Sequence, residues 1–311
     1  MSIGRLCVVV STYNGGSYLE QQIESIEEQT VIPDLIYIRD DGSSDNTKEI
    51  IRNLARAYPN ISFALGSNVG WRKSFVEALS NCGEFDWYAF CDQDDYWLPT
   101  KIEAALDALQ QAPANVPVLY AGNVTVADSD LNPSHLFNRE PVDIINKDCP
   151  HTLTRDEMAG GLTYVFNKHA KRLLVAFQPR GITGHDRILM LICKLYGRVV
   201  YDSDSHVLYR QHGGNAIGAS AGQAPRRTIR QKLRNLLEPD DRERQLVAGG
   251  LLALSEYGFV PNEADMSFLR LVSTLKGSLF SRLALLLRRN VGAYTFREEI
   301  KFRIKILFGD F

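Results

Sequence analysis

The 311-residue sequence lacks the features that would make it a disulfide-stapled, zinc-stabilised or membrane-spanning protein. Its five cysteines stand at positions 7, 82, 91, 149 and 193, and no pair has the Cys-x-x-Cys spacing of a zinc site. An odd number of cysteines fits a reducing compartment. No apolar run reaches the roughly 18 residues of a transmembrane helix, and the N-terminus shows no signal-peptide pattern. We therefore expect a cytoplasmic protein with a hydrophobic core.

The sequence also has no large excess of one charge, because its formal net charge is -2. This balance argues against a general nucleic-acid-binding protein. The charge is unevenly distributed, however, since residues 226–311 carry 16 Lys/Arg against 10 Asp/Glu. The preceding residues carry the remaining acidic excess. The pattern indicates an acidic main domain followed by a basic C-terminal region.

The first 120 residues alternate between short apolar strands and amphipathic helices. Apolar runs predict strands at 5–11, 34–39, 61–65, 87–91 and 116–120. Helical spacing of apolar residues predicts helices around 19–26, 44–54, 75–79 and 99–110. This alternation predicts an α/β fold with a mostly parallel sheet flanked by helices. Such sheets bind ligands at the carboxyl ends of their strands.

The rest of the chain is less regular. Residues 121–160 contain three prolines and are expected to be irregular, and 213–223 predicts a mobile loop because it is rich in Gly, Ala and Ser. Between them, helices are expected near 163–177 and 186–196, and two short strands near 198–201 and 205–209. The basic region predicts amphipathic helices at 228–237, 245–257, 266–289 and 296–308.

Polar motifs stand at the ends of the first three predicted strands. In Ser11-Thr12-Tyr13-Asn14-Gly15, the tyrosine ring can stack on a nucleobase or pack beneath a loop. In Asp40-Asp41-Gly42-Ser43, the carboxylates can accept hydrogen bonds from a base or a ribose, whereas the nearby Asp45 suits a helix N-cap. Asn68-Val69-Gly70-Trp71-Arg72-Lys73 offers two cations at a helix start, which suit a pyrophosphate or simply a solvated surface.

The densest cluster of charge follows the fourth predicted strand. The segment Phe90-Cys91-Asp92-Gln93-Asp94-Asp95-Tyr96-Trp97-Leu98 holds three carboxylates within four positions. Like charges this close resist ionisation unless a cation is present. Mg²⁺ or Mn²⁺ would supply that cation, because both prefer oxygen ligands and phosphate oxygens. The alternative is a solvated acidic turn, which a position at a buried strand end disfavours.

Taken together, these motifs resemble the family-2 glycosyltransferases. The resemblance rests on Thr-Tyr-Asn, Asp-Asp-Gly-Ser, Asn-x-Gly and Asp-Gln-Asp-Asp in order at four strand ends, and it covers about residues 5–215. It implies the GT-A fold and inversion of the anomeric centre. The segment 90–102 is similar to bacterial rhamnosyltransferases of surface polysaccharide synthesis. The chain has no Gln-x-x-Arg-Trp motif, which disfavours a processive synthase.

The resemblance also implies roles for individual residues. The nucleotide would contact Thr12, Tyr13, Asn14, Asp40, Asp41, Asn68, Arg72, Lys73 and Asp92. Asp94 and His212 would hold Mg²⁺ or Mn²⁺, although a lone histidine is often structural. Asp186 would be the general base, unless it only caps a helix together with Thr183. Acceptor or phosphate contacts would come from Asp95, Trp97, Gly160, Gly161, His185 and Arg210.

The resemblance also divides the chain. Residues 1–215 would form the GT-A domain, with a nucleotide-sugar half at 1–120 and an acceptor half at 121–215. A linker at 216–225 would lead to the helical basic region at 226–311. That region can lie on an anionic membrane, which would put the protein on the inner face of the plasma membrane, or pack on the core or on a second copy in a homodimer.

The expected function is transfer of a sugar from a dTDP or UDP donor to a glycan acceptor, which can be lipid-linked. L-rhamnose from dTDP-L-rhamnose is the first expectation, and UDP-galactose, UDP-glucose and UDP-GlcNAc are alternative donors. A nucleotidyltransferase also combines an α/β sheet with acidic metal ligands, but Gly15-Gly16 has no nearby lysine for a phosphate loop. A noncatalytic nucleotide-sugar-binding module is the third class.

Overall fold

We analysed a computed structural model of the chain, which describes residues 4–138, 160–177, 183–213, 242–259, 261, 263–289 and 296–308. The expected linker at 216–225, the expected helix at 228–237 and Cys149 lie outside the described residues. The same holds for the part of the 121–160 segment that follows residue 138, apart from residue 160.

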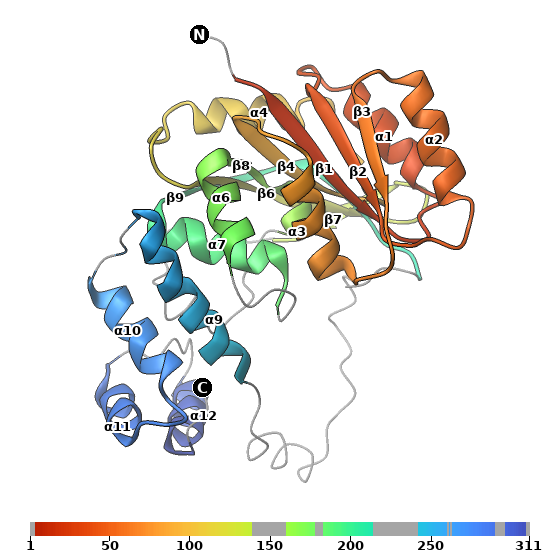
Figure 1. Cartoon of the computed structure of the whole chain (residues 1–311). Helices are drawn as coiled ribbons and strands as arrows, with labels where there is room; N and C mark the ends of the chain where they lie inside the picture. Colours follow the sequence, from red (N-terminus) through yellow and green to blue (C-terminus); the bar gives the residue numbers. More distant parts are fainter. Residues whose placement is uncertain are drawn as a thin grey trace.

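The first half of the chain forms the predicted alternation of strands and helices (Figure 1). Its strands are parallel in the spatial order β3-β2-β1-β4: β1 (Leu6–Thr12), β2 (Leu35–Asp40), β3 (Ile61–Leu65) and β4 (Trp87–Asp92). The helices between and after them are α1 (Leu19–Glu27), α2 (Thr47–Ala57), α3 (Trp71–Asn81) and α4 (Lys101–Leu109). Val8 and Val10 pack into one core cluster and Val9 into the other, because successive strand side chains point to opposite faces.

The second half extends the same sheet in the order β4-β8-β6-β9-β5, with β7 paired to β6. Its strands are β5 (Tyr96–Trp97), β6 (Val118–Ala127), β7 (Pro133–Leu136), β8 (Val165–Asn167) and β9 (Arg198–Arg210). β8 runs antiparallel to both neighbours, whereas β9 is parallel to β6. A 3-10 turn at Gly161–Thr163 precedes β8, and the helices α6 (Lys168–Ala176) and α7 (His185–Tyr196) follow it.

Three expectations for this half were wrong. Residues 121–127 continue β6 instead of being irregular, and β7 follows them. The two strands expected at 198–209 form one strand, whose pairing with β6 shifts register near Gly122 and Asn123. The helix expected from residue 163 begins only at Lys168, because Val165–Asn167 pairs with β4 and β6.

The described part of the C-terminal region is helical, as predicted. It contains α9 (Arg242–Ala253), a 3-10 helix at Leu254–Tyr257, α10 (Glu263–Ser273), α11 (Leu279–Leu287) and α12 (Phe296–Leu307). The single helix expected at 266–289 is two helices, because Ser278 caps α11 by accepting a hydrogen bond from the N–H of Ser281 at 3.1 Å. None of the described helices is long and apolar enough to cross a bilayer.

The inner faces of these helices share a hydrophobic cluster with the sheet, α3, α6 and α7. The Tyr196 hydroxyl of α7 donates a hydrogen bond to the carbonyl of Leu251 in α9. Nearby, Arg187 and Glu243 form an ion pair at 3.5 Å. The basic region therefore packs on the core through one side, and Figure 1 shows α9 to α12 extending beyond α7.

Lys101 is a buried cation beside Trp97, in the core cluster that contains Val8 and Val10. Its burial leads to a prediction about stability. Its Nζ lies 3.5 Å from the centroid of the Trp97 ring and has no hydrogen-bond partner among the described residues. Burial lowers the pKa of Lys101 to about 7, against about 10.4 in an unfolded chain. Burying the charged lysine therefore lowers the free energy of unfolding, and this cost is complete at pH values below the pKa of the folded state. The cost decreases as the pH rises from that pKa toward the pKa of the unfolded chain.

We expect the free energy of unfolding of the wild type to rise from pH 7 to about pH 10, relative to Lys101→Met. The difference should be on the order of 1 kcal/mol per pH unit. Urea denaturation of both proteins at several pH values measures it. Parallel pH profiles for the two proteins would show that this lysine does not carry the pH dependence.

Candidate active site

Strand register brings the sequence motifs together at the carboxyl edge of the sheet. Thr12 pairs with Asp40 across β1 and β2, and Ser11 pairs with Asp92 across β1 and β4. Parallel neighbours end at the same edge, so the aromatic motif lies between the two acidic motifs. The expected clustering of these polar residues is present.

Gln93 of the fourth motif connects the loop after β4 to the loop after β1 through hydrogen bonds. Its Oε1 accepts hydrogen bonds from the Thr12 hydroxyl at 2.6 Å and from the N–H of Tyr13 at 2.9 Å. Its Nε2 donates to the Tyr13 carbonyl at 3.3 Å. The backbone of Tyr13 is held, while its side chain remains 48% exposed. The ring therefore stands at the sheet edge with surface available for a ligand.

Asp40 combines deep burial with an unused acceptor. Its Oδ2 accepts hydrogen bonds from the N–H groups of Gly42 at 3.2 Å and Ser43 at 3.1 Å. Its Oδ1 is buried and has no hydrogen-bond partner among the described residues. A buried carboxylate oxygen without a donor is costly, so it marks a position where a ligand N–H or O–H would be favourable.

Asn14 joins the first and second motifs from the side. Its N–H donates to the Ser43 hydroxyl at 2.8 Å, and its Oδ1 accepts from the N–H of Ser44 at 2.9 Å. The turn at Gly42 has a positive φ of 80°, and a Cβ there would lie 2.9 Å from the backbone nitrogen of Asn68. Only glycine satisfies both conditions, so the three loops are packed as one unit.

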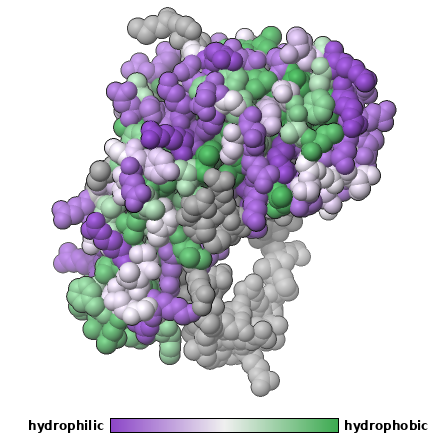
Figure 2. All heavy atoms as spheres, in the orientation of Figure 1, coloured by the Kyte–Doolittle hydropathy of each residue, from purple (hydrophilic) through white to green (hydrophobic). Residues whose placement is uncertain are grey.

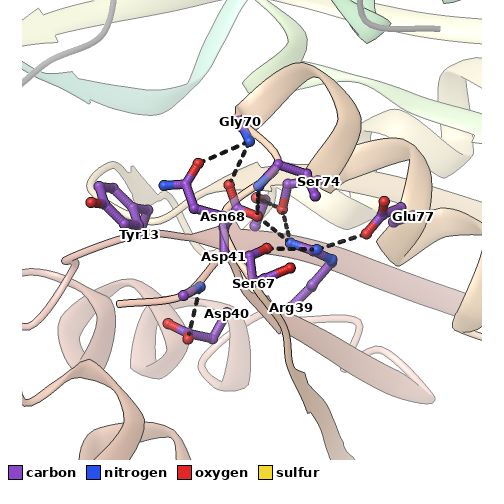
Figure 3. A network of polar contacts seen from close by, with 12 residues as sticks. Tyr13, Arg39, Asp40, Asp41, Ser67, Asn68, Gly70, Ser74 and Glu77 are labelled. Carbon is purple, nitrogen blue, oxygen red and sulfur yellow. Dashed lines mark hydrogen bonds and ion pairs between the residues drawn. The ribbon is translucent and has the colours of Figure 1, made fainter. Parts of the chain in front are cut away.

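Asp41 serves this packing rather than facing outward like Tyr13 (Figure 3). Its Oδ1 accepts hydrogen bonds from Arg39 at 2.6 Å and from the N–H of Val69 at 2.9 Å, and its Oδ2 accepts from the N–H of Gly70 at 2.9 Å. Its side chain is only 3% exposed. Asp41 thus fixes the loop that follows β3.

Arg39 lies at the centre of the same network. Its guanidinium contacts Asp41, the Ser74 hydroxyl at 2.9 Å and the Ser67 carbonyl at 3.3 Å, and it forms an ion pair with Glu77 at 2.6 Å. Asp41 directly follows β2, whereas the other partners lie on the loop after β3 and on α3, as Figure 3 shows. Sequence reasoning missed this residue, although an arginine directly before Asp40 in an apolar strand signals a buried ion pair.

The third motif presents its side chains toward solvent. Asn68 Oδ1 accepts a hydrogen bond from the N–H of Gly70 at 3.2 Å, and Arg72 and Lys73 are exposed at the first turn of α3. The Arg72 guanidinium lies 4.7 Å from the centroid of the Trp71 ring. Both cations therefore remain accessible to an anionic ligand beside the sheet edge.

The fourth motif concentrates negative charge. Burial, followed by the charges of Asp94 and Asp186, raises the pKa of Asp92 to about 7. Asp94 Oδ2 lies 2.8 Å from His212 Nε2, and both side chains are partly buried. The structure thus brings both predicted metal ligands into direct contact. The start of α7, which carries Asp186, also lies at β4, because the ring of His185 is 4.6 Å from the ring of Phe90.

A carboxylate and an imidazole suit Mg²⁺ or Mn²⁺ when substrate phosphates complete the coordination. Within the described ranges, no three His, Cys, Asp or Glu side chains form a complete protein-built metal site. The contact between Asp94 and His212 places one carboxylate and one imidazole where they could hold such a cation.

Asp95 and Arg210 lie beneath this pair. Burial, followed by the charges of Asp92 and Asp94, raises the pKa of Asp95 well above its usual range. Arg210 is 3% exposed and donates to the carbonyls of Asp94 at 2.8 Å and Ser129 at 2.8 Å and to Gln21 at 2.6 Å. These contacts hold the backbone of the acidic motif. Its guanidinium thus contacts main-chain carbonyl groups and Gln21, and its contact with a leaving phosphate stays a prediction.

Two glycines make room for Asp186 at the first turn of α7. A Cβ on Gly161 would lie 2.7 Å from the Asp186 Cβ, and a Cβ on Gly184 would lie 2.2 Å from its Oδ1. The same Oδ1 accepts a hydrogen bond from the N–H of Arg187 at 2.8 Å, which fixes the orientation of the carboxylate. Gly160, by contrast, would meet only the side chain of Leu162.

Substituting Gly184 by alanine should misplace the Asp186 carboxylate without straining the backbone, since Gly184 has a φ of -61°. We expect turnover to fall about 100-fold, while the free energy of unfolding falls by about 1 kcal/mol or less. Steady-state kinetics and urea denaturation measure the two effects. The matched control is Gly249→Ala in α9, where a Cβ would lie 4.0 Å from its nearest neighbour and turnover should not change. Equal turnover in Gly184→Ala and the wild type would contradict the hypothesis that turnover requires the space that Gly184 leaves for the Asp186 carboxylate.

Two predicted acceptor residues lie in the core. Trp97 is 1% exposed between α1 and α4, and its backbone N–H donates to the Ser25 hydroxyl at 3.1 Å. His185 is 6% exposed and stacks on Phe75 with ring centroids 4.1 Å apart. Burial lowers the pKa of His185 to about 4, so it is neutral at pH 7. Both side chains are thus buried, and their roles in acceptor binding stay predictions.

Comparison with known proteins agrees with this architecture. Residues 7–167 match the family model for Glycosyl transferase family 2. The dTDP-rhamnosyl transferase RfbG of Shigella flexneri is 30% identical over 223 residues, which cover 68% of this chain and 74% of that protein. An N-acetylglucosaminyl-diphospho-decaprenol L-rhamnosyltransferase of Mycobacterium tuberculosis is 29% identical over 35% of this chain and 38% of its own length.

Solved structures share the fold at low sequence identity. TarS residues 1–349 from S. aureus, in complex with UDP-GlcNAc, has a TM-score of 0.57 at 17% identity and covers 96% of this chain and 78% of that one. GalNAc-T7 with UDP, GalNAc and Mn²⁺ has a TM-score of 0.53 at 13% identity, with coverage of 68% and 44%. The fold is therefore the GT-A fold of glycosyltransferases. The chain belongs to glycosyl transferase family 2.

Proposed function

We propose that this protein is an inverting, metal-dependent transferase that moves L-rhamnose from dTDP-L-rhamnose to a glycan hydroxyl during synthesis of a bacterial surface polysaccharide. The observation that carries the proposal is the approach of α7 to the end of β4, where the ring of His185, next to Asp186, lies 4.6 Å from the ring of Phe90. A base on α7 and diphosphate ligands on the loop after β4 would then share one site.

Residues at the sheet edge would bind the nucleotide. Tyr13 would stack on the base, because its ring is exposed while its backbone is held by Gln93. The Oδ1 of Asp40 would accept a hydrogen bond from the base N–H, which would satisfy its buried oxygen. Asp92 would accept from the sugar hydroxyl of the nucleoside. Arg72 and Lys73 are exposed near this edge and would contact the phosphates.

Transfer would then need a base and a stabilised leaving group. Asp186 would take the proton of the acceptor hydroxyl as the oxygen bonds to the anomeric carbon, and the bond from that carbon to the diphosphate would break with its electron pair. Asp94 and His212 would hold the Mg²⁺ or Mn²⁺, which when bound neutralises charge on the leaving diphosphate. Gly161 borders Asp186, and it would leave space for the acceptor sugar together with Gly160, which precedes it.

Rhamnose is proposed as the donor sugar because two relatives carry rhamnosyl transfer in their names. The mycobacterial relative's name describes a lipid-linked acceptor, which supports a similar acceptor here. Under this proposal residues 1–120 bind the donor, 121–215 form the acceptor side, and the basic region at 226–311 holds the protein on the inner face of the plasma membrane.

A nucleotide-release assay tests the proposal. The protein would be incubated with dTDP-L-rhamnose, UDP-glucose, UDP-galactose or UDP-GlcNAc, with Mn²⁺ or with EDTA. We expect release of dTDP from dTDP-L-rhamnose that depends on Mn²⁺ and increases with a rhamnose-accepting glycan. Preference for a UDP-sugar would reject only the donor assignment. Absence of both binding and turnover with every donor would reject the function.

A further inference from the structure

The helix α11 has one face in the core and one large apolar face in solvent. Its inner face carries Ser281 and Leu285, which are 4% and 0% exposed. Its outer face carries Leu279 (69% exposed), Phe280 (76%), Leu283 (51%) and Leu287 (86%). Figure 2 shows hydrophobic atoms gathered over this part of the molecule, at the lower left of the view. We call these four residues the α11 face.

The spacing makes the α11 face continuous. Leu279, Leu283 and Leu287 are four residues apart, so they follow one another along one side of the helix. A contiguous apolar patch of this kind is unusual on a soluble protein and marks a surface that binds something.

The charge around the α11 face indicates the occupant. Between residues 274 and 308 the sequence has eight Lys/Arg and two Glu. Lys276 precedes the helix, Arg289 follows it, and Lys301 lies on α12, which packs against α11; all three side chains are exposed. Apolar side chains flanked by cations match an anionic bilayer, whose interface accepts both. A symmetric dimer through the α11 face would instead bring these cations close to their own copies.

We propose that α11 docks this protein on an anionic phospholipid bilayer, with the α11 face in the interface and Lys276, Arg289 and Lys301 at the headgroups. The inference deepens the proposed function, because it would hold the active site at the surface that carries a lipid-linked acceptor. The docking depends on exposed residues of α11 and its surroundings, all of which lie outside the candidate active site.

Vesicle co-sedimentation of the full chain tests the docking. The wild type should bind vesicles of phosphatidylcholine with about 30% phosphatidylglycerol at least about tenfold more tightly than pure phosphatidylcholine vesicles. A triple variant, Leu279→Gln, Leu283→Gln and Leu287→Gln, should lose about tenfold or more of that affinity. About 0.5 M NaCl should also weaken binding, since it screens the cations.

The matched control replaces exposed apolar residues elsewhere. Ile32→Gln and Leu136→Gln, at 60% and 40% exposure, should bind vesicles like the wild type. Equal binding by the triple variant and the wild type would overturn the proposal. So would a wild-type protein that does not bind vesicles and forms a dimer, if the triple variant is a monomer in light scattering.

Nucleotide release with a water-soluble acceptor separates membrane docking from the proposed transferase function, because the triple variant should retain this activity. Vesicle binding by a protein without turnover would reject only the proposed function.

Discussion

Asp94→Ala is expected to abolish metal-dependent turnover, with a loss of about 10³-fold or more in kcat/KM. Asp94 contacts His212 at 2.8 Å, so under the proposed function its removal would leave only His212 of the two residues proposed to hold the metal. The diphosphate would then lose the cation that neutralises its charge as it leaves. The effect should appear as a loss of Mn²⁺-dependent nucleotide release at every Mn²⁺ concentration tested.

The side chain of Asp94 is partly exposed and its backbone is held independently, because Arg210 binds its carbonyl oxygen. The variant should therefore fold, and its thermal unfolding midpoint without ligand should stay near that of the wild type. Asp107→Asn is the control, since Asp107 is an exposed carboxylate on α4. Nucleotide-sugar and Mn²⁺ together should stabilise the wild type and Asp107→Asn by mass action, but Asp94→Ala much less. Turnover within a few-fold of the wild type in Asp94→Ala would reject the metal role.

Much of the site could be predicted because strand ends in a parallel sheet share one edge. Each of β1, β2 and β4 is a short apolar run that ends in a polar motif, so local pattern alone brings Tyr13, Asp40 and Asp92 together. The apolar run of β3 was predicted in the same way, and so was the position of Arg72 and Lys73 in the segment that follows it. These parts of the fold rest on local periodicity and on the geometry of parallel pairing.

The surroundings of other predicted site residues depend on long-range contacts. Trp97 stands in an acidic motif that resembles an acceptor site, but pairing of β5 with β9 turns its ring into the core. Arg210 is the last residue of β9 and binds carbonyl groups of Asp94 and Ser129, which are 116 and 81 residues away in sequence. Sequence can indicate that such a cation needs partners, but the partners are set by tertiary packing.

Short elements were missed for a related reason. β8 has only three residues and directly precedes α6 in sequence, so its apolar residues look like the first turn of that helix. In the basic region, helical periodicity continues across the break between α10 and α11, and Gly277-Ser278 is the local signal for that break. The exposure of the α11 face could not be predicted, because periodicity reveals two apolar sides without showing which one the core covers.

Asp186→Asn should separate donor binding from transfer. The amide keeps the shape of the carboxylate and can still accept the hydrogen bond from the N–H of Arg187, but it cannot take the acceptor proton. We expect kcat to fall about 10²- to 10⁴-fold, while donor affinity, measured by titration in Mn²⁺, changes little. This pattern differs from that of Asp94→Ala, in which donor binding should fail as well.

Asp204→Asn, at an exposed position of β9, is the matched control and should keep wild-type turnover. The Asp186→Asn result also distinguishes a base from a helix cap. If Asp186 only caps α7, the asparagine should serve nearly as well, because Asn and Asp are similar caps. Transfer would then stay near the wild-type rate, whereas loss of transfer with unchanged unfolding would require the carboxylate for the chemical step.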